Sequence, residues 1–264
     1  MDLHTVTEVI SPAAPGQWRP GDAWLGGGTA LLGEPRPEIV RLLDLTAAGW
    51  PAVTERADGV EIAATCTIAE LIETLGRYPI VGQCCHSFLA SFKIWNVATV
   101  GGNLCASLPA GPMISLGAAL DGVCALIGPD GAERRVPVAE FVTGEGVNVL
   151  RPGELLRAIH LPSAAVGALT SYRRGSLFRN GRSAALLIGR RLDRGGLALT
   201  VTAATRRPHV LRFDRGPDAN ELAAALAEIP AEQYVTDVHG HPDWRRHLTG
   251  LYAEQIRVEL GEGA

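Results

Sequence analysis

The stretch that most constrains the fold is a glycine-rich segment near the start of the chain, GGGTALLG at residues 26–33. A dinucleotide-binding GxGxxG fingerprint fails here, because Leu31 and Ala30 stand where glycines are needed. A Walker loop fails as well, because Glu34 and Pro35 replace its Lys and Ser/Thr. Glycines still let a backbone approach an anion closely. The segment is therefore either an anion-binding loop of another kind or a plain tight turn between a strand and a helix.

A second segment, TVGGN at residues 99–103, has the same ingredients: a hydroxyl, paired glycines and a polar amide. Another close turn, PAGP at 109–112, follows soon after. Two separate loops of this type suit a ligand that has a pyrophosphate and two ends. The pair therefore favours a dinucleotide that is held from two sides.

The residue pattern predicts mixed helices and strands without a clean βαβ alternation, so a doubly wound sheet is not expected. Strands are expected at 39–46 and in hairpins around 58–59 and 129–131. Thr67 with Glu70 predicts a capped helix, and a second helix is expected over 81–95. Beyond 168, two strands should flank a helix at 183–192, and the last fifty residues have helical periodicity.

Composition excludes several classes of protein. The net charge of −4 argues against a nucleic-acid binder. No apolar run reaches about 18 residues and no signal peptide is visible, so we expect a soluble, cytoplasmic chain without a membrane span. The five cysteines lack the paired spacing of metal sites and are expected to be buried apolar residues, so no bound metal is predicted. The His239–His241 pair is expected at a cap or an interface.

The two loops together carry a family resemblance. WLGGGTALL and IWNVATVGGNLCASLPAGP resemble the FAD-binding medium subunit of the molybdenum hydroxylases, the xanthine dehydrogenase and carbon monoxide dehydrogenase flavoproteins. The likeness continues through LRPGELLRAIHLP, SYRRGS and DVHGHPDWRRHLTGLYAEQI. It implies an α+β fold: a two-lobed PCMH-type FAD-binding domain over 1–165, split near 50–55. A small α+β domain of the carbon monoxide dehydrogenase flavoprotein C-terminal type would follow over 166–264.

The resemblance also implies a set of FAD-binding residues, with no catalytic residue and no metal ligand. The set is Gly26, Gly27, Gly28, Thr29, Ala30, Leu31, Ala98, Thr99, Gly101, Gly102, Asn103, Leu150 and Arg173. Thr99 and Asn103 are expected to make polar contacts to the phosphates. Arg173 either faces the flavin, where a cation stabilises the reduced form, or makes a surface salt bridge.

The chain departs from the family pattern in four places, one of which is Ala106-Ser107-Leu108-Pro109 where Asn-Ala-Ser-Pro is common. Trp95 replaces an arginine, Ala30 replaces an acidic residue, and Pro112 stands where an aspartate able to hold a ribose hydroxyl is common. Because a proline side chain accepts no hydrogen bond, the adenosine end of FAD is expected to be held differently.

The function that the resemblance implies is electron transfer within a multi-subunit complex. Substrate would be oxidised at a molybdopterin centre on a large subunit, and electrons would pass through two [2Fe–2S] clusters on a small subunit. FAD on this chain would hand them to NAD or another acceptor, in a dimer of heterotrimers. Two alternatives stay open: a stand-alone FAD-dependent oxidoreductase, and an assembly module that has lost FAD.

Overall fold

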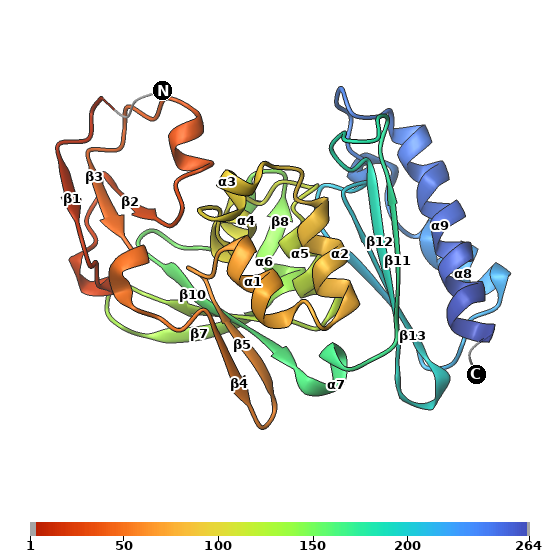
Figure 1. Cartoon of the computed structure of the whole chain (residues 1–264). Helices are drawn as coiled ribbons and strands as arrows, with labels where there is room; N and C mark the ends of the chain where they lie inside the picture. Colours follow the sequence, from red (N-terminus) through yellow and green to blue (C-terminus); the bar gives the residue numbers. More distant parts are fainter. Residues whose placement is uncertain (1–3, 263–264) are drawn as a thin grey trace.

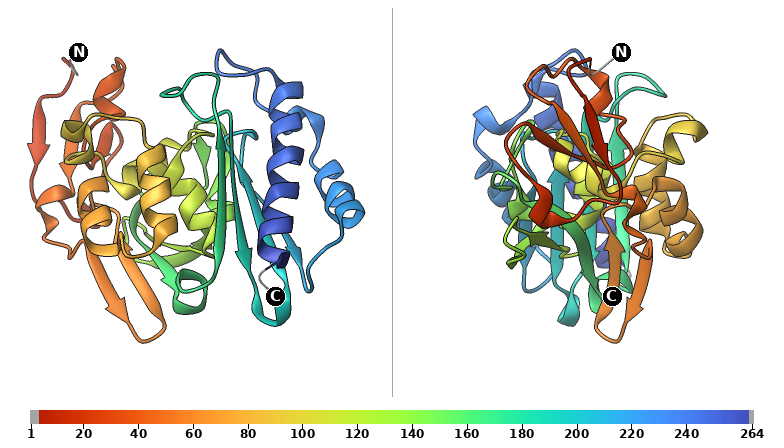
Figure 2. Two further views of the ribbon diagram at one scale, coloured as in Figure 1. Left: turned by 45° about the vertical axis from the view of Figure 1, so that its right-hand side comes forward. Right: turned by 90° about the vertical axis from the view of Figure 1, so that its left-hand side faces the viewer.

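The structure is a computed structural model that describes residues 4–262. Three sheets, each with its own helices or turns, follow one another along the chain and lie side by side (Figure 1). The two further views show that the first sheet and the C-terminal helices lie at opposite ends of the molecule (Figure 2). No helix among residues 4–262 has the length and apolar character needed to cross a bilayer.

The first sheet has the parallel strand order β1-β3-β2. Its strands are β1 (Glu8–Ile10), β2 (Asp22–Leu25) and β3 (Arg41–Asp44). Short 3-10 turns connect them at Pro15–Gln17 (η1) and Leu31–Gly33 (η2), and a third, Thr46–Ala48 (η3), follows β3. The Arg41 guanidinium binds both carboxylate oxygens of Asp22, which ties β3 to the start of β2.

The second sheet is antiparallel, with strand order β4-β5-β10-β6-β7. Its strands are β4 (Val53–Arg56), β5 (Gly59–Ala63), β6 (Val123–Ile127), β7 (Glu133–Pro137) and β10 (Leu155–Pro162). The helices of this part are α1 (Ile68–Leu75), α2 (Pro79–Ser87), α3 (Phe92–Trp95), α4 (Val100–Ala106), α5 (Pro112–Ala119), α6 (Val138–Phe141) and α7 (Ser163–Val166). A small ribbon, β8 (Val142–Gly144) with β9 (Val147–Asn148), precedes the turn into β10.

The third sheet is an antiparallel meander of β11 (Thr170–Gly175), β12 (Ala185–Arg191), β13 (Leu197–Thr202) and β14 (His209–Phe213). The 3-10 turn η4 (Asp193–Gly195) joins β12 to β13. The last helices, α8 (Ala219–Ala227) and α9 (Pro242–Glu262), cover the face that points away from the rest of the chain, with η5 (Ala231–Gln233) between them (Figure 1).

The other face of the third sheet packs on α2 and α5. Leu186 and Ile188 of β12 belong to the same buried cluster as the core of the second sheet. The Ser115 and Thr202 hydroxyls share a buried hydrogen bond of 2.6 Å, and Ala203 N–H donates to Pro109 O at 2.9 Å. The third sheet is therefore part of one continuous packed body.

Most of the predicted elements are confirmed. The strand at 39–46 appears as β3, both hairpins form, and the last fifty residues are largely helical. Thr67 caps α1 in a capping box with Glu70. The α+β class predicted from the sequence is confirmed.

Three predictions were wrong in detail. The segment 183–192 contains strand β12 and not a helix. The prediction failed because both faces of this sheet are covered, so β12 lacks the alternation of polar and apolar residues that marks a half-exposed strand. The helix expected over 81–95 ends at Ser87 and resumes only as the short α3. The helix start expected after the first glycines is the 3-10 turn η2.

Candidate functional site

The two glycine loops meet in space. A methyl group on Gly27 would lie 1.5 Å from Val97 O, so the backbone of the first loop rests directly on the residues that precede the second. A methyl group on Gly26 would lie 3.0 Å from Thr99 Oγ1. Only glycine at position 27 allows this approach. The site predicted from two segments about seventy residues apart is therefore one continuous surface.

The first loop offers hydrogen-bond donors that no protein group uses. Among the described residues, the backbone N–H groups from Gly26 to Ala30 have no acceptor. Gly28 has a φ of +71°, a left-handed conformation that directs successive N–H groups toward one side. Thr29 adds an exposed hydroxyl. A run of free amides in a glycine turn is the donor set that a pyrophosphate needs, so the residues present fit the FAD that the sequence predicts.

The second loop is bonded differently. Val100 N–H donates to Cys66 O at 2.8 Å, and Gly101 N–H donates to Ala64 O at 2.9 Å. Thr99 Oγ1 accepts from Gly102 N–H at 3.0 Å, which caps α4. The first amides of α4 are thus already satisfied. This loop fixes the floor of the site, whereas the first loop carries the free donors.

The other predicted residues of the second loop are of two kinds, buried residues that hold the loop in place and accessible residues that can contact a ligand. Ala98 and Gly101 are buried, and a methyl group on Gly101 would lie 2.5 Å from Ala64 Cβ. Gly102 is exposed. Asn103 Oδ1 accepts from Met113 N–H at 3.0 Å, which orients the side chain and leaves its amide nitrogen as a donor for a ligand. In the first loop, Leu31 lies half-buried at the start of η2.

A cavity of about 460 Å³ opens where the two loops meet. Gly26, Gly27 and Thr99 form one wall, and Asn96 and Val97 continue it. The remaining lining comes from Thr46, Trp50, Ala52, Thr65, Cys66, Thr67 and Glu70. Half of its lining residues are polar, namely Thr46, Thr65, Thr67, Glu70, Asn96 and Thr99, and the rest are apolar or glycine. Sequence reasoning did not select these residues for the site, because no motif connects the η3 region, β5 and α1 to the glycine loops.

A second cavity, of about 240 Å³, lies at the other end of α4. It is lined by Ser87, Phe88, Leu89, Asn103, Leu108, Ala110, Gly111, Pro112, Asn180, Arg182 and Ser183. One side is largely apolar and the other is a polar loop of the C-terminal part. Pro112, the residue that replaces the expected aspartate, lies in this wall. The contribution of the C-terminal loop could be found only once the third sheet was placed against α2 and α5.

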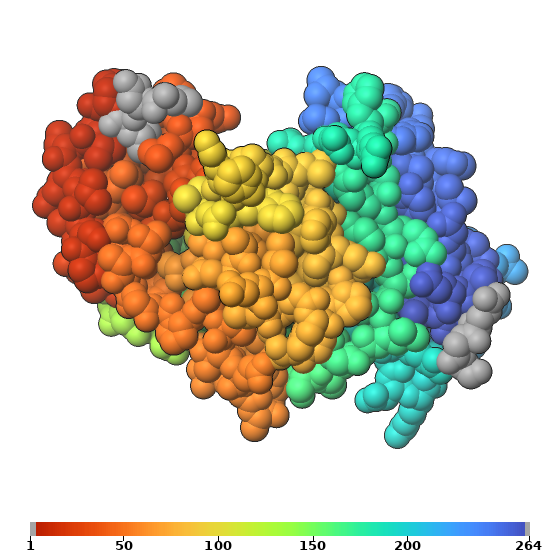
Figure 3. Space-filling view, in the orientation of Figure 1, coloured from red at the N-terminus to blue at the C-terminus, as the bar shows by residue number. Residues whose placement is uncertain are grey.

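The surface above these elements is hollowed. In the space-filling view, the first lobe and the C-terminal part rise on either side of a lower region formed by the yellow segment around residues 90–105 (Figure 3). The short helix α3 belongs to this segment, and Phe92 on it is 72% exposed. Trp95, the residue in place of the family arginine, turns inward: its Nε1 donates to Phe88 O at 2.9 Å.

Two predicted residues line neither of the cavities beside the glycine loops. Leu150 follows β9, and its N–H donates to Asn148 Oδ1 at 3.1 Å. Arg173 lies on the face of β11 that meets α9, where its guanidinium binds Glu259 at 2.6 Å and Gln255 at 3.0 Å. Of the two roles expected for Arg173, the structure shows the salt bridge and does not bring the side chain to the loops.

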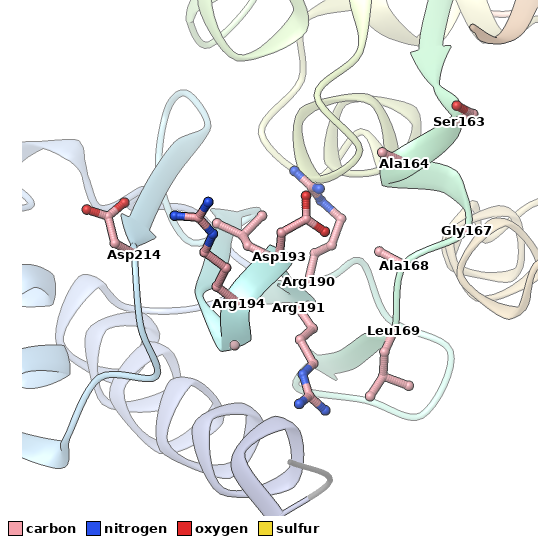
Figure 4. A pocket seen from close by; sticks show the side chains of 12 residues that line it. Ser163, Ala164, Gly167, Ala168, Leu169, Arg190, Arg191, Asp193, Arg194 and Asp214 are labelled. Carbon is pink, nitrogen blue, oxygen red and sulfur yellow. The ribbon is translucent and has the colours of Figure 1, made fainter.

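A larger cavity, of about 1260 Å³, lies elsewhere, between α7 and the η4 turn (Figure 4). Arg190 points from it toward α5, and its donors are used by Ala119 O and the Asp121 carboxylate. Arg194 and Asp214 lie on its far side (Figure 4). Because its charges are mixed and it is remote from both glycine loops, size alone does not make it the cofactor site.

The cysteines are not arranged as metal ligands. Burial raises the pKa of the Cys66, Cys85 and Cys105 thiols to about 12. Thiols with such a pKa stay protonated and unreactive at neutral pH. Within residues 4–262, no group of three or more His, Cys, Asp or Glu side chains is placed to hold a metal ion.

Comparison with known proteins identifies the class. Residues 13–164 match the family described as the FAD binding domain in molybdopterin dehydrogenase. This match spans more than half of the chain, so the protein belongs to this family and FAD is its cofactor. The family resemblance read from the two glycine motifs is thereby confirmed.

Individual relatives agree with this assignment. The carbon monoxide dehydrogenase medium chain of Afipia carboxidovorans is 29% identical over 157 residues, which cover 57% of this chain and 54% of that protein. The chain therefore matches about half the length of this curated relative.

Solved structures share the fold over nearly the whole chain. Quinoline 2-oxidoreductase from Pseudomonas putida 86 superposes with a TM-score of 0.82 at 18% identity, covering 100% of this chain and 99% of that one. Carbon monoxide dehydrogenase from Hydrogenophaga pseudoflava gives 0.81 at 20% identity, covering 95% of each chain. The third sheet and its helices thus belong to the shared fold.

Proposed function

We propose that this chain is the FAD-binding electron-transfer subunit of a molybdenum-dependent hydroxylase or dehydrogenase. The observation that carries the proposal is the run of free amides from Gly26 to Ala30, held against Val97 in a chain of this family. When bound, FAD supplies the capacity to take up and release electrons. The protein's part is to bind, orient and shield it, which needs no acid–base residue.

We infer that the diphosphate of FAD is held by the first loop. Gly26 to Leu31 would contact it, with Thr29 as the side-chain donor. Thr99, Gly102 and Asn103 would form the adjoining wall, while the buried Ala98 and Gly101 would keep the second loop in place. Because a cavity lies at each end of α4, the two ends of the cofactor would have separate places.

The chemistry of the two cavities assigns the two ends. The polar cavity beside Thr65, Thr67 and Glu70 suits an adenosine, which carries ribose hydroxyls. The cavity walled by Phe88, Leu89 and Leu108 suits the apolar rings of the flavin. This assignment provides the Thr65 hydroxyl and the second oxygen of the Glu70 carboxylate at the adenosine end, because Thr67 Oγ1 and Glu70 Oε2 already bond in the α1 capping box.

The positive charge near the flavin would then come from Arg182 rather than from Arg173. Arg182 lines this cavity, whereas Arg173 is paired with Glu259 on the opposite face of β11. Arg174, which neighbours Arg173 on the strand, binds Gly181 O and Ser183 Oγ and so holds the loop that carries Arg182. A cation at this place would favour the electron-rich form of the cofactor.

The partners follow from the proposed role. Electrons would arrive from [2Fe–2S] clusters on a small subunit, after substrate oxidation on a large molybdopterin-binding subunit. They would leave to NAD or another acceptor, within a dimer of heterotrimers. The division into domains at 1–165 and 166–264, and the cytoplasmic location, stay predictions of the sequence.

The test is the cofactor content of the full chain and of the complex from which it comes. Purified chain should show a flavin spectrum and release about one FAD per chain on denaturation. Co-purified material should contain iron and molybdenum. A chain that is colourless and takes up no added FAD would contradict the proposal and favour the assembly module, while turnover of a small substrate by the isolated chain would favour the stand-alone oxidoreductase.

A further inference from the structure

The segment 148–154, which joins β9 to β10, is bonded at one end to the end of α4 and at the other end to the first lobe. At its start, Asn148 Nδ2 donates to Cys105 O at 2.9 Å and to Ser107 Oγ at 3.1 Å. Both acceptors lie at the end of α4, the helix that the second glycine loop begins. The start of the segment is thus fastened to the second loop through one short helix.

The other end of the segment touches the first lobe. Trp24 Nε1 donates to Gly153 O at 3.3 Å, and Trp24 stands two residues before the first glycine of the first loop. Gly153 has a φ of +80°, and a methyl group on it would lie 2.8 Å from the Trp18 ring. Position 153 therefore requires glycine both for its backbone conformation and for its close packing on the first lobe.

Between these two contacts, an ion pair fixes the shape of the segment. Arg134 of β7 donates through Nε and a terminal nitrogen to the two oxygens of Glu154, at 2.7 and 2.6 Å. The same guanidinium reaches Val149 O at 2.7 Å, and Glu154 also accepts from Arg151 N–H at 2.8 Å. Glu154 is only 8% exposed. A bidentate pair of this kind has one geometry, so it holds residues 149–154 rigidly on the second sheet.

We propose that residues 148–154 are a strut that sets the distance between the two glycine loops, with Arg134 and Glu154 as positioning residues for FAD. This proposal rests on the proposed function. Neither side chain lines the two cavities beside the glycine loops. They act through Gly153 and Trp24 on the first loop, and through Asn148 on the second. A binding site spread over two lobes loses affinity when its halves shift by about 1 Å, even if both halves remain folded.

The first lobe offers a matched control pair. Arg41 binds Asp22 in the same bidentate way and donates to Gln17 O at 2.7 Å, but all three residues lie within the first lobe. Arg41→Gln and Arg134→Gln therefore remove the same kind of buried ion pair. Only the second removes a contact of the segment that joins the two lobes.

The experiment measures FAD dissociation constants by calorimetry, and melting temperatures without FAD, for the full chain and both variants. The expected result is similar losses of melting temperature, with FAD bound at least about tenfold more weakly by Arg134→Gln than by Arg41→Gln. Equal FAD affinity in the two variants would overturn the proposal. Trp24→Phe, which removes only the donor to Gly153 and keeps the ring, should also weaken FAD binding while folding normally.

Two further outcomes separate this proposal from the proposed function. If the unmodified chain takes up no FAD, the proposed function has failed. If the unmodified chain binds FAD, and neither Trp24→Phe nor Arg134→Gln lowers FAD affinity more than the control does, only the proposed role of residues 148–154 is wrong. Arg134→Lys keeps the charge but loses the bidentate geometry, so it should restore melting temperature more fully than FAD affinity.

Discussion

At the scale of single residues, the glycines of the first loop differ sharply in what they tolerate. Gly27 lies against Val97 O, where a methyl group would overlap the carbonyl at 1.5 Å. Gly33 ends the same stretch, and a methyl group there would meet nothing within 4 Å. A glycine-rich segment can therefore contain some positions where packing requires glycine and others where a larger residue fits.

We predict that Gly27→Ala separates the two loops and weakens FAD binding on the order of a hundredfold, because the clash is with backbone that cannot rotate away. Gly33→Ala, the matched control, should bind FAD as the unmodified chain does. Calorimetric titration with FAD measures both. Equal affinity of the two variants would contradict the contact that joins the loops.

Arg182, in the loop before β12, and Arg173, on the α9 side of β11, give a second prediction. Arg182→Gln removes the cation that lines the cavity proposed for the flavin, so it should lower the reduction potential of the bound flavin by about 30 mV. Arg173→Gln removes the partner of Glu259 on α9 and should leave the potential unchanged. Spectroelectrochemical titration measures the reduction potential of the flavin in both variants. A lower potential in Arg173→Gln and an unchanged one in Arg182→Gln would show that Arg173 is the cation near the flavin.

At the scale of elements, short sequence motifs correctly predicted the turns and helix caps, which depend on neighbouring residues. Asp-Gly at a hairpin and Thr67 with Glu70 at a helix start were sufficient, because turns and caps depend on neighbouring residues. Strand β12 could not be predicted in this way. Its residues from Ala185 to Ile188 are apolar on both faces of the sheet. One face packs on the core shared with the second sheet and the other on the core under α9, and both cores are formed largely by residues distant in the sequence.

The cap of α4 carries a prediction at this scale. Thr99→Ala removes the acceptor for Gly102 N–H and should cost about 1 kcal/mol of stability. Asp218→Ala removes the equivalent cap of α8, remote from the site, at a similar cost. Urea unfolding compares the stabilities, and FAD titration should show weaker binding only for Thr99→Ala. An equal loss of affinity in both variants would mean that α4 serves stability alone.

At the scale of the whole molecule, the sequence predicted the two loops of the candidate site but not the other segments that line its cavities. The cavity near Thr65 and the wall from Asn180 to Ser183 come from segments with no recognisable motif. They reach the site because separate sheets pack together. Arg173 shows the same limit: a motif gives its position in the strand, while the side of the strand that it occupies depends on which face meets α9.

Stability against acid should depend on the ion pair that holds the strut. The Arg134 guanidinium lowers the pKa of Glu154 below its ordinary value of 4.5. A carboxyl whose pKa is lowered on folding stabilises the protein above the ordinary pKa, and this contribution is lost as pH falls through the folded-state pKa. Glu154→Gln should therefore cost on the order of 2 kcal/mol at pH 7 and progressively less below about pH 4.

Urea unfolding of the unmodified chain and Glu154→Gln across pH 3 to 7 measures the difference. A gap in stability that stays constant over this range would show that the pair does not titrate as expected. Asp22, whose pKa is lowered by Arg41 in the first lobe, should give the same pH dependence without the loss of FAD affinity.

The packing of Trp18 and Trp24 against the strut has an optical consequence. The chain has five tryptophans. Trp50 lines the cavity beside Thr65, and Trp95 lies beneath the hollowed surface. Together with Trp18 and Trp24, which contact the strut, they surround the candidate site. Trp244, on α9, stands next to Arg245, whose guanidinium binds Ala184 O beside the cavity proposed for the flavin. Energy transfer to flavin should therefore quench much of the intrinsic emission, so the chain carries its own optical reporter of cofactor binding.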